Sequence, residues 1–144
     1  MALDKEIKEQ LAQYLALLES EVVFQASLAS DDNSIKVKEF LEEIVAMSPM
    51  ISLEELSLSR TPSFKIAEKG QTSGVEFAGL PLGHEFTSFI LALLQVSGRA
   101  PKVDDTVIQQ IKAIDQSLSF ETYVSLTCHN CPDVVQALNL IAIN

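Results

Sequence analysis

Cysteine is scarce in this sequence of 144 residues. Only two cysteines occur, Cys128 and Cys131, and they lie within four positions of each other. Such a pair cannot build the framework of several disulfides that stabilises many small secreted domains. The two thiols are therefore expected to be redox-active, to bind a metal, or to be incidental to function.

Basic side chains and long apolar runs are scarce as well. The chain has 10 lysines and arginines against 20 acidic residues, a net charge of −10 that repels nucleic-acid phosphates and anionic lipid headgroups. No apolar run reaches the roughly 18 residues that a membrane-spanning helix needs, and the charged N-terminus lacks the apolar centre of a signal peptide. We predict a cytoplasmic protein with neither a nucleic-acid nor a membrane partner.

The hydrophobic content of 47% is sufficient for one core, or for two small units that share one. In the first half, the spacing of apolar residues predicts a helix over residues 5–18 and another over residues 34–45. Alternation predicts a strand over residues 22–28, and a second strand is expected over residues 51–58. Together these elements form a β-α-β unit.

A hairpin and a helix complete the first unit. Two short strands, residues 63–68 and 75–78, flank a turn-rich stretch with Gly70 and Gly74. An apolar helix follows over residues 86–94. This order of elements predicts an α/β domain over residues 1–100.

The remainder, residues 101–144, repeats the beginning of the chain. A helix is expected to start at Asp104, an alternating strand to run from Leu118 to Leu126, and a loop and a second helix to follow. We therefore predict two related units, of which the first has no cysteine and the second carries both.

The two cysteines form the motif Cys128-His129-Asn130-Cys131, between the predicted strand and the last helix. Unpaired amides and the dipole at a helix N-terminus favour a thiolate, so Cys128 is the expected nucleophile. Cys131 is expected in the first helical turn as the resolving thiol, and Pro132 is compatible with that turn. This position favours a redox-active dithiol.

A metal site is the weaker interpretation of the motif. Zinc prefers four nitrogen or sulfur ligands, and this chain reaches that number only by adding His84 and His129 to the two cysteines. Covalent haem attachment is excluded, because CxxCH requires a histidine where Pro132 stands. We predict no metal.

For His129, two roles stay open: tuning the charge of the thiolate, or an exposed loop position without function.

Three segments of the sequence are distinctive: Pro81-Leu82-Gly83-His84-Glu85-Phe86-Thr87-Ser88, Phe120-Glu121-Thr122-Tyr123, and the stretch from Cys128 to Leu140. Together they resemble the N-terminal domain of the bacterial alkyl hydroperoxide reductase flavoprotein subunit. The resemblance covers nearly the whole chain. It implies two tandem thioredoxin-like units, of which the second keeps the CHNC dithiol.

The resemblance also implies a function. Electrons would come from a thioredoxin-reductase-like flavoprotein portion that uses FAD and NADH, and would pass to the disulfide of a peroxiredoxin. Cys128 would attack that disulfide, and Cys131 would release the product. Glu85 would lie near the dithiol and influence its protonation; the alternative is a solvated acid in a helical turn. Pro62 would follow a cis peptide bond, with an ordinary trans proline as the alternative.

The sequence departs from that family at its C-terminus. It stops at Asn144, directly after the CxxC helix, and it contains no GxGxxG motif, so no cofactor is expected in this chain itself. We expect a truncated second unit that either self-associates into a homo-oligomer or lies against the first unit. Two competing functions stay open: a non-catalytic docking adaptor and a general protein-disulfide reductase.

Overall fold

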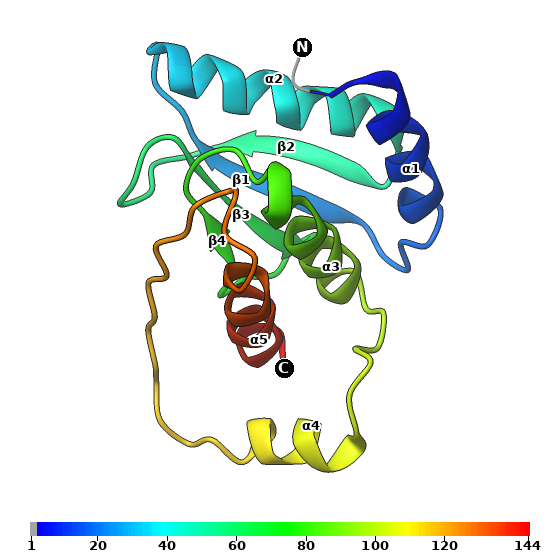
Figure 1. Cartoon of the computed structure of the whole chain (residues 1–144), viewed down its shortest axis with the longest axis vertical. Helices are drawn as coiled ribbons and strands as arrows, with labels where there is room; N and C mark the ends of the chain where they lie inside the picture. Colours follow the sequence, from blue (N-terminus) through cyan, green and yellow to red (C-terminus); the bar gives the residue numbers. More distant parts are fainter. Residues whose placement is uncertain (1–2) are drawn as a thin grey trace.

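The computed structural model describes residues 3–144, and its centre is a mixed four-stranded sheet (Figure 1). The strand order is β2-β1-β3-β4. Strand β1 (Val22–Ser27) pairs in parallel with β2 (Ile51–Glu55) and antiparallel with β3 (Ser63–Glu68), and β3 continues to the short β4 (Glu76–Phe77). The predicted α/β unit is therefore present, although β2 and β4 are shorter than the pattern indicated.

Helix α2 (Asp32–Met47) makes the crossover that a parallel pair of strands requires. The Asp31 side chain caps its start and accepts hydrogen bonds from the Ser34 amide at 3.3 Å and the Ser34 hydroxyl at 2.7 Å. The bond from the hydroxyl lowers the pKa of Asp31, because it stabilises the carboxylate. The Asp31 side chain thus stabilises the turn that precedes α2.

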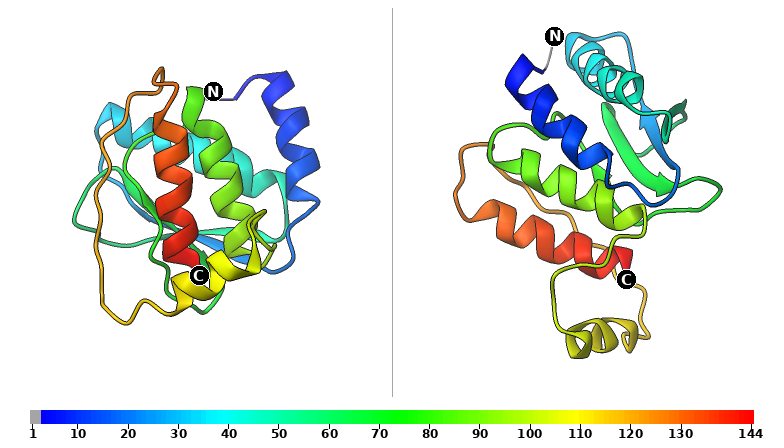
Figure 2. Two further views of the ribbon diagram at one scale, coloured as in Figure 1. Left: turned by 60° about the horizontal axis from the view of Figure 1, so that its bottom comes forward. Right: turned by 90° about the vertical axis from the view of Figure 1, so that its right-hand side faces the viewer.

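Aromatic rings fill the space between the sheet and two helices that cover the same face. Phe89 of α3 (Phe86–Val96) lies with its ring centroid 5.3 Å from Phe40 of α2, and 6.0 Å from both Phe24 and Phe64 of the sheet. All four rings are fully buried. Helix α1 (Lys5–Leu15) packs beside α3 (Figure 2) and buries Leu11 and Leu15.

The C-terminal part attaches to this unit through one helix. Helix α5 (Cys131–Ile143) lies beside α3, where Gln136 Nε2 donates to Ser88 Oγ at 3.2 Å (Figures 1 and 2). The short helix α4 (Asp105–Lys112) stands away from the sheet, at the end of two extended connections. Of the two expectations for the C-terminal segment, the structure thus shows the segment lying against the first unit.

The prediction of a strand from Leu118 to Leu126 is wrong. These residues follow the alternating pattern, yet they form no ladder with any other residue of 3–144. A strand is stable only beside a hydrogen-bonded neighbour, and the alternation reveals a tendency to pair but not the presence of a partner. Separately, no helix in the described range is long and apolar enough to cross a bilayer.

The core can be tested with two leucines of different burial. Leu41 of α2 is fully buried, whereas Leu17, just after α1, is 41% exposed. We expect Leu41→Ala to lower the free energy of unfolding by about 2–5 kcal/mol, because it removes buried methyl groups and leaves a cavity. Leu17→Ala should cost less than about 1 kcal/mol. Guanidinium unfolding with the disulfide intact measures both; equal losses would contradict this core.

Candidate functional site

Cys128 and Cys131 are joined by a disulfide whose Cα atoms lie 5.5 Å apart, inside the usual range. Both residues are half-buried. Helix α5 begins at Cys131 and has Pro132 in its first turn, as predicted. Cys128 lies three positions earlier, in a turn where its amide donates to the Ser125 carbonyl at 3.1 Å. The pair is therefore a small-ring disulfide at the start of a helix.

The turn before the disulfide is held by the 3-10 helix η1 (Gly83–Glu85), which directly precedes α3. The His84 amide donates to the Leu126 carbonyl at 2.9 Å. Gly83 has a φ of +58°, and a Cβ there would lie 2.8 Å from that carbonyl oxygen. Glycine is therefore required at this position for conformation and for space.

Two histidines meet beside the disulfide. The rings of His84 and His129 are edge to face, with centroids 4.8 Å apart. Both residues are exposed. Across residues 3–144, no three His, Cys, Asp or Glu side chains are grouped so that they could hold a metal ion. The contact of His84 with His129 was not predicted from the sequence, because 45 positions separate the two residues.

Glu85 is buried, with 3% of its surface exposed. Within the described residues, neither of its carboxylate oxygens has a hydrogen-bond partner. The alternative of a solvated acid is therefore wrong for this residue. Glu85 belongs to η1, the same short helix that contacts the cysteine-bearing turn and packs against α5. One element therefore carries the buried carboxyl group and holds the turn.

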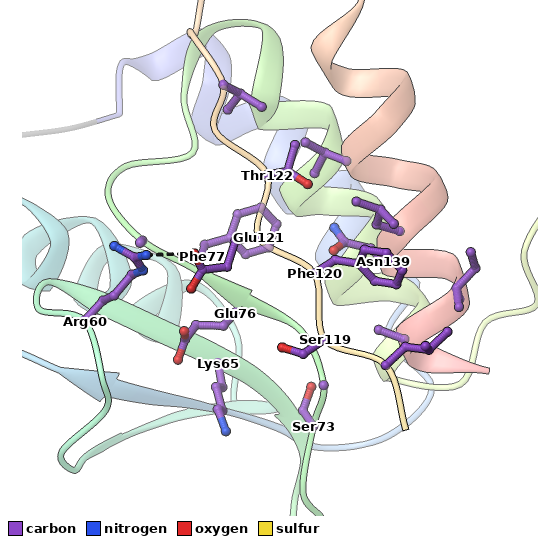
Figure 3. Close-up of a pocket in the computed structure, with 18 of the residues that line it drawn as sticks. Arg60, Lys65, Ser73, Glu76, Phe77, Ser119, Phe120, Glu121, Thr122 and Asn139 are labelled. Atoms are coloured by element: carbon purple, nitrogen blue, oxygen red, sulfur yellow. Dashed lines mark hydrogen bonds and ion pairs between the residues drawn. The ribbon is translucent and has the colours of Figure 1, made fainter. Parts of the chain in front are cut away.

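A groove of about 1270 Å³ opens between the sheet edge, α5 and residues 117–126, which we call the arm (Figure 3). Lys65 and Glu76 line it from the sheet, Phe120 from the arm and Asn139 from α5. Glu85 also lines the groove, whereas neither cysteine does. The buried acid thus lines a cavity that does not contain the dithiol.

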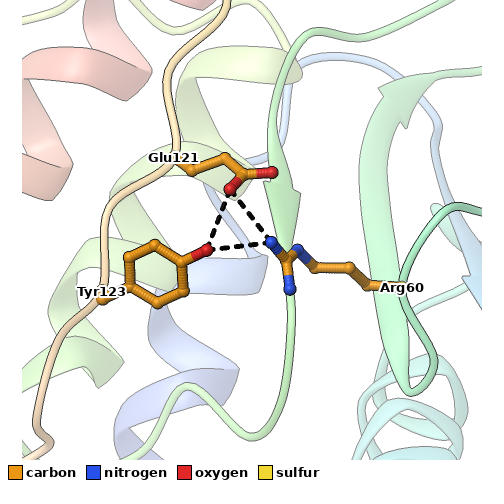
Figure 4. A network of polar contacts seen from close by, with 3 residues as sticks. All are labelled: Arg60, Glu121 and Tyr123. Atoms are coloured by element: carbon orange, nitrogen blue, oxygen red, sulfur yellow. Dashed lines mark hydrogen bonds and ion pairs between the residues drawn. The ribbon is translucent and has the colours of Figure 1, made fainter.

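A polar network ties the arm to the first unit (Figure 4). Arg60 Nη2 donates to Glu121 Oε2 at 2.9 Å and to the Tyr123 hydroxyl at 3.0 Å, and that hydroxyl donates to Glu121 Oε2 at 2.9 Å. The bonds from Tyr123 and then Arg60 lower the pKa of Glu121, and Glu121 raises the pKa of Arg60.

Arg60 stands two positions before Pro62, whose preceding peptide bond is cis, as the resemblance implied.

Relatives of known sequence match almost the full chain. The F subunit of alkyl hydroperoxide reductase from Staphylococcus aureus (strain NCTC 8325) is 57% identical over 141 residues, 98% of this chain. A Bacillus subtilis (strain 168) protein named NADH dehydrogenase is 54% identical over 143 residues, 99% of this chain. The chain spans 28% of the length of each relative. No protein-family model matches the chain.

Solved structures agree with these relatives. The NTD_N/C domain of the alkyl hydroperoxide reductase AhpF from Enterococcus faecalis (V583) superposes with a TM-score of 0.83 at 29% identity, covering 98% of this chain and 74% of that one. The chain matches the N-terminal region of AhpF. A protein disulfide oxidoreductase from Aeropyrum pernix superposes with a TM-score of 0.81 at 18% identity, covering 99% and 68%. The fold is thus thioredoxin-like, and it matches the N-terminal domain of AhpF.

Replacing Gly83 tests the contact that holds the cysteine-bearing turn. Gly83→Ala strains a positive φ and places a methyl group against the Leu126 carbonyl. Gly79→Ala also strains a positive φ, of +107°, but its methyl group meets nothing within 4 Å. We expect both variants to lose about 1 kcal/mol of stability to backbone strain, and Gly83→Ala alone to lose more.

The readouts for these two variants are chemical denaturation and the alkylation rate of the reduced cysteines. Gly83→Ala should change that rate because the turn before Cys128 moves, whereas Gly79→Ala should leave it unchanged. Identical stability and identical alkylation in the two variants would show that η1 does not position the turn.

The network at Glu121 predicts a pH-dependent arm. Because the pKa of Glu121 is lowered in the folded protein, the network is complete above the ordinary carboxyl value of about 4.3 and is lost as pH falls through the lowered value. In NMR titrations, the Tyr123 ring signals should follow this transition. Arg60→Gln should move its midpoint upward, and Lys65→Gln, a charge change that also lines the groove, should not.

Proposed function

We propose that this chain is a thiol/disulfide electron-transfer module that relays reducing equivalents from an NADH-dependent flavoprotein to the disulfide of a peroxiredoxin. The observation that carries the proposal is the Cys128–Cys131 disulfide at the start of α5 in a thioredoxin-like chain that matches the N-terminal region of AhpF. The match to the N-terminal region of AhpF in a solved structure at 29% identity supports the same assignment.

The proposed reaction starts from the reduced dithiol. The Cys128 thiolate attacks one sulfur of the partner disulfide; that S–S bond breaks, a mixed disulfide forms, and the second partner sulfur leaves as a thiolate. The Cys131 thiolate then attacks Cys128 Sγ and releases the first partner sulfur. Two electrons pass to the partner, and the Cys128–Cys131 bond forms again, which is the state of this structure.

Glu85 has a supporting role in this proposal. Its buried carboxyl group has no hydrogen-bond partner within residues 3–144 and belongs to the element that anchors the cysteine-bearing turn. We assign it an influence on the protonation of the dithiol, as a positioning and proton-exchanging group. Changing it should alter how thiolate formation depends on pH.

The division of labour along the chain also belongs to the proposal. Residues 1–100 would be the thioredoxin-like unit without cysteines, and residues 101–144 the beginning of the unit with the dithiol. FAD and NADH would be bound by the flavoprotein portion, since the sequence of this chain contains no GxGxxG motif. The module would work in the cytoplasm.

Trapping the mixed disulfide tests the proposal. The reduced Cys131→Ser variant should attack an oxidised peroxiredoxin and accumulate as a covalent complex, because the resolving thiol is missing. Cys128→Ser should give at least about tenfold less complex, because that variant lacks the thiolate that attacks the partner. Mass spectrometry of the complex identifies which sulfur is bound.

Controls separate the competing functions. Glu85→Gln in the Cys131→Ser background should shift the pH profile of trapping, while Glu76→Gln, which also lines the groove, should not. Equal trapping of an unrelated protein disulfide would favour a general disulfide reductase. Tight binding of the peroxiredoxin without any covalent complex in either cysteine variant would contradict the proposal and favour a docking adaptor.

A further inference from the structure

The ring contact of His84 with His129 joins the first unit to the redox motif. His129 lies inside the motif, directly after Cys128, and its ring meets the His84 ring edge to face with centroids 4.8 Å apart. His84 belongs to η1, which packs against α5 and directly precedes α3. The contact is therefore made by a side chain from outside the motif, and the reaction proposed above does not use it.

The backbone is fixed on both sides of this contact. The His84 amide donates to the Leu126 carbonyl at 2.9 Å, and the Cys128 amide donates to the Ser125 carbonyl at 3.1 Å. Neither bond involves a histidine ring. An exposed side chain samples several rotamers unless a neighbour restricts it. The His84 ring, carried by the anchored η1, is thus placed to restrict the ring of His129.

Carboxyl groups predominate around the contact. Helix α3 has no titratable side chain, whereas α5 has Asp133 in its first turn and η1 itself carries buried Glu85. The arm brings Glu121 and Tyr123, both of which bond to Arg60. A thiolate is disfavoured by nearby carboxylates and favoured by a nearby cation or hydrogen-bond donor. The source of positive charge next to the dithiol is therefore decisive for its reactivity.

We propose that His84 is a positioning residue for the dithiol: its ring holds His129 so that the His129 imidazole stabilises the Cys128 thiolate. An imidazole donates a hydrogen bond when neutral and adds positive charge when protonated. Within η1, α3, α5 and the cysteine-bearing turn, the two histidines are the side chains that can carry positive charge. This inference rests on the proposed redox function.

A stabilised thiolate shifts the thiol–disulfide equilibrium. When two glutathione thiols reduce the Cys128–Cys131 bond, the pair gains two electrons and glutathione disulfide forms. Cys131 keeps a proton, and the Cys128 proton goes to solvent. Stabilising the Cys128 thiolate favours this reduced state. Because both histidines are exposed, water weakens the effect, and we expect a change of about three- to tenfold.

Glutathione titration of side-chain variants tests the inference. His84→Ala keeps the backbone bond to Leu126, and it should shift the equilibrium about three- to tenfold toward the disulfide and raise the pH midpoint of Cys128 alkylation. Thr87→Ala, an exposed change in the first turn of α3, is the matched control and should alter neither. His84→Phe keeps a ring against His129 and should retain most of the parent equilibrium. If it behaves like His84→Ala, positioning by the ring contact is refuted.

A double-mutant cycle shows whether His84 acts through His129. In the His129→Ala background, His84→Ala should have no further effect on either readout. Guanidinium unfolding of the oxidised variants should give equal stabilities, which excludes a general loss of structure. An equal shift in both backgrounds, or no shift for His84→Ala in the parent chain, would overturn this inference alone. A parent dithiol that does not equilibrate with glutathione would overturn the proposed function together with it.

Discussion

The contact of η1 with Leu126 is the constraint on which the position of the redox centre depends. The C-terminal part has no sheet of its own within the described residues, so the turn before Cys128 is positioned by contacts with the first unit. The close approach of Gly83 and the hydrogen bond from His84 to the Leu126 carbonyl provide that support. The same short element carries buried Glu85 and brings His84 against His129, so one turn organises the polar surroundings of the disulfide.

The attachment of the C-terminal part has two very different ends. At one end, α5 lies along α3 and its last residues reach the core, where Ile143 packs against buried side chains. At the other end, the arm is held to the first unit by the exposed network of Arg60, Glu121 and Tyr123. Exposed ion pairs of this kind contribute little to stability and weaken with salt. The helix is thus the firmer of the two attachments.

The local elements of the first unit follow from the sequence because they are controlled by side-chain periodicity. Phe24 and Phe89 mark the buried faces of a strand and a helix, and both are fully buried. The cysteine positions and Pro132 at the start of the last helix were also predictable. The family resemblance added Glu85 and the cis bond before Pro62, which no local pattern reveals.

Other features depend on tertiary contacts and could not be predicted for that reason. The prediction of a strand from Leu118 to Leu126 failed because the alternation of apolar and polar residues indicates a tendency to pair, while a ladder needs a second strand. The contact of His84 with His129, and that of Arg60 with Glu121, join residues 45 and 61 positions apart. Such contacts are created by the packing of η1 and the arm, and not by any spacing along the chain.

The most direct test of the central claim is a redox titration of Cys128 and Cys131 against a thiol buffer, with and without a zinc chelator, measured by alkylation and mass spectrometry. We predict one reversible two-electron transition between about −200 and −300 mV, the range of dithiol carriers, unchanged by the chelator. Thiols that never pair, or that react only after chelation, would contradict a redox role for this dithiol.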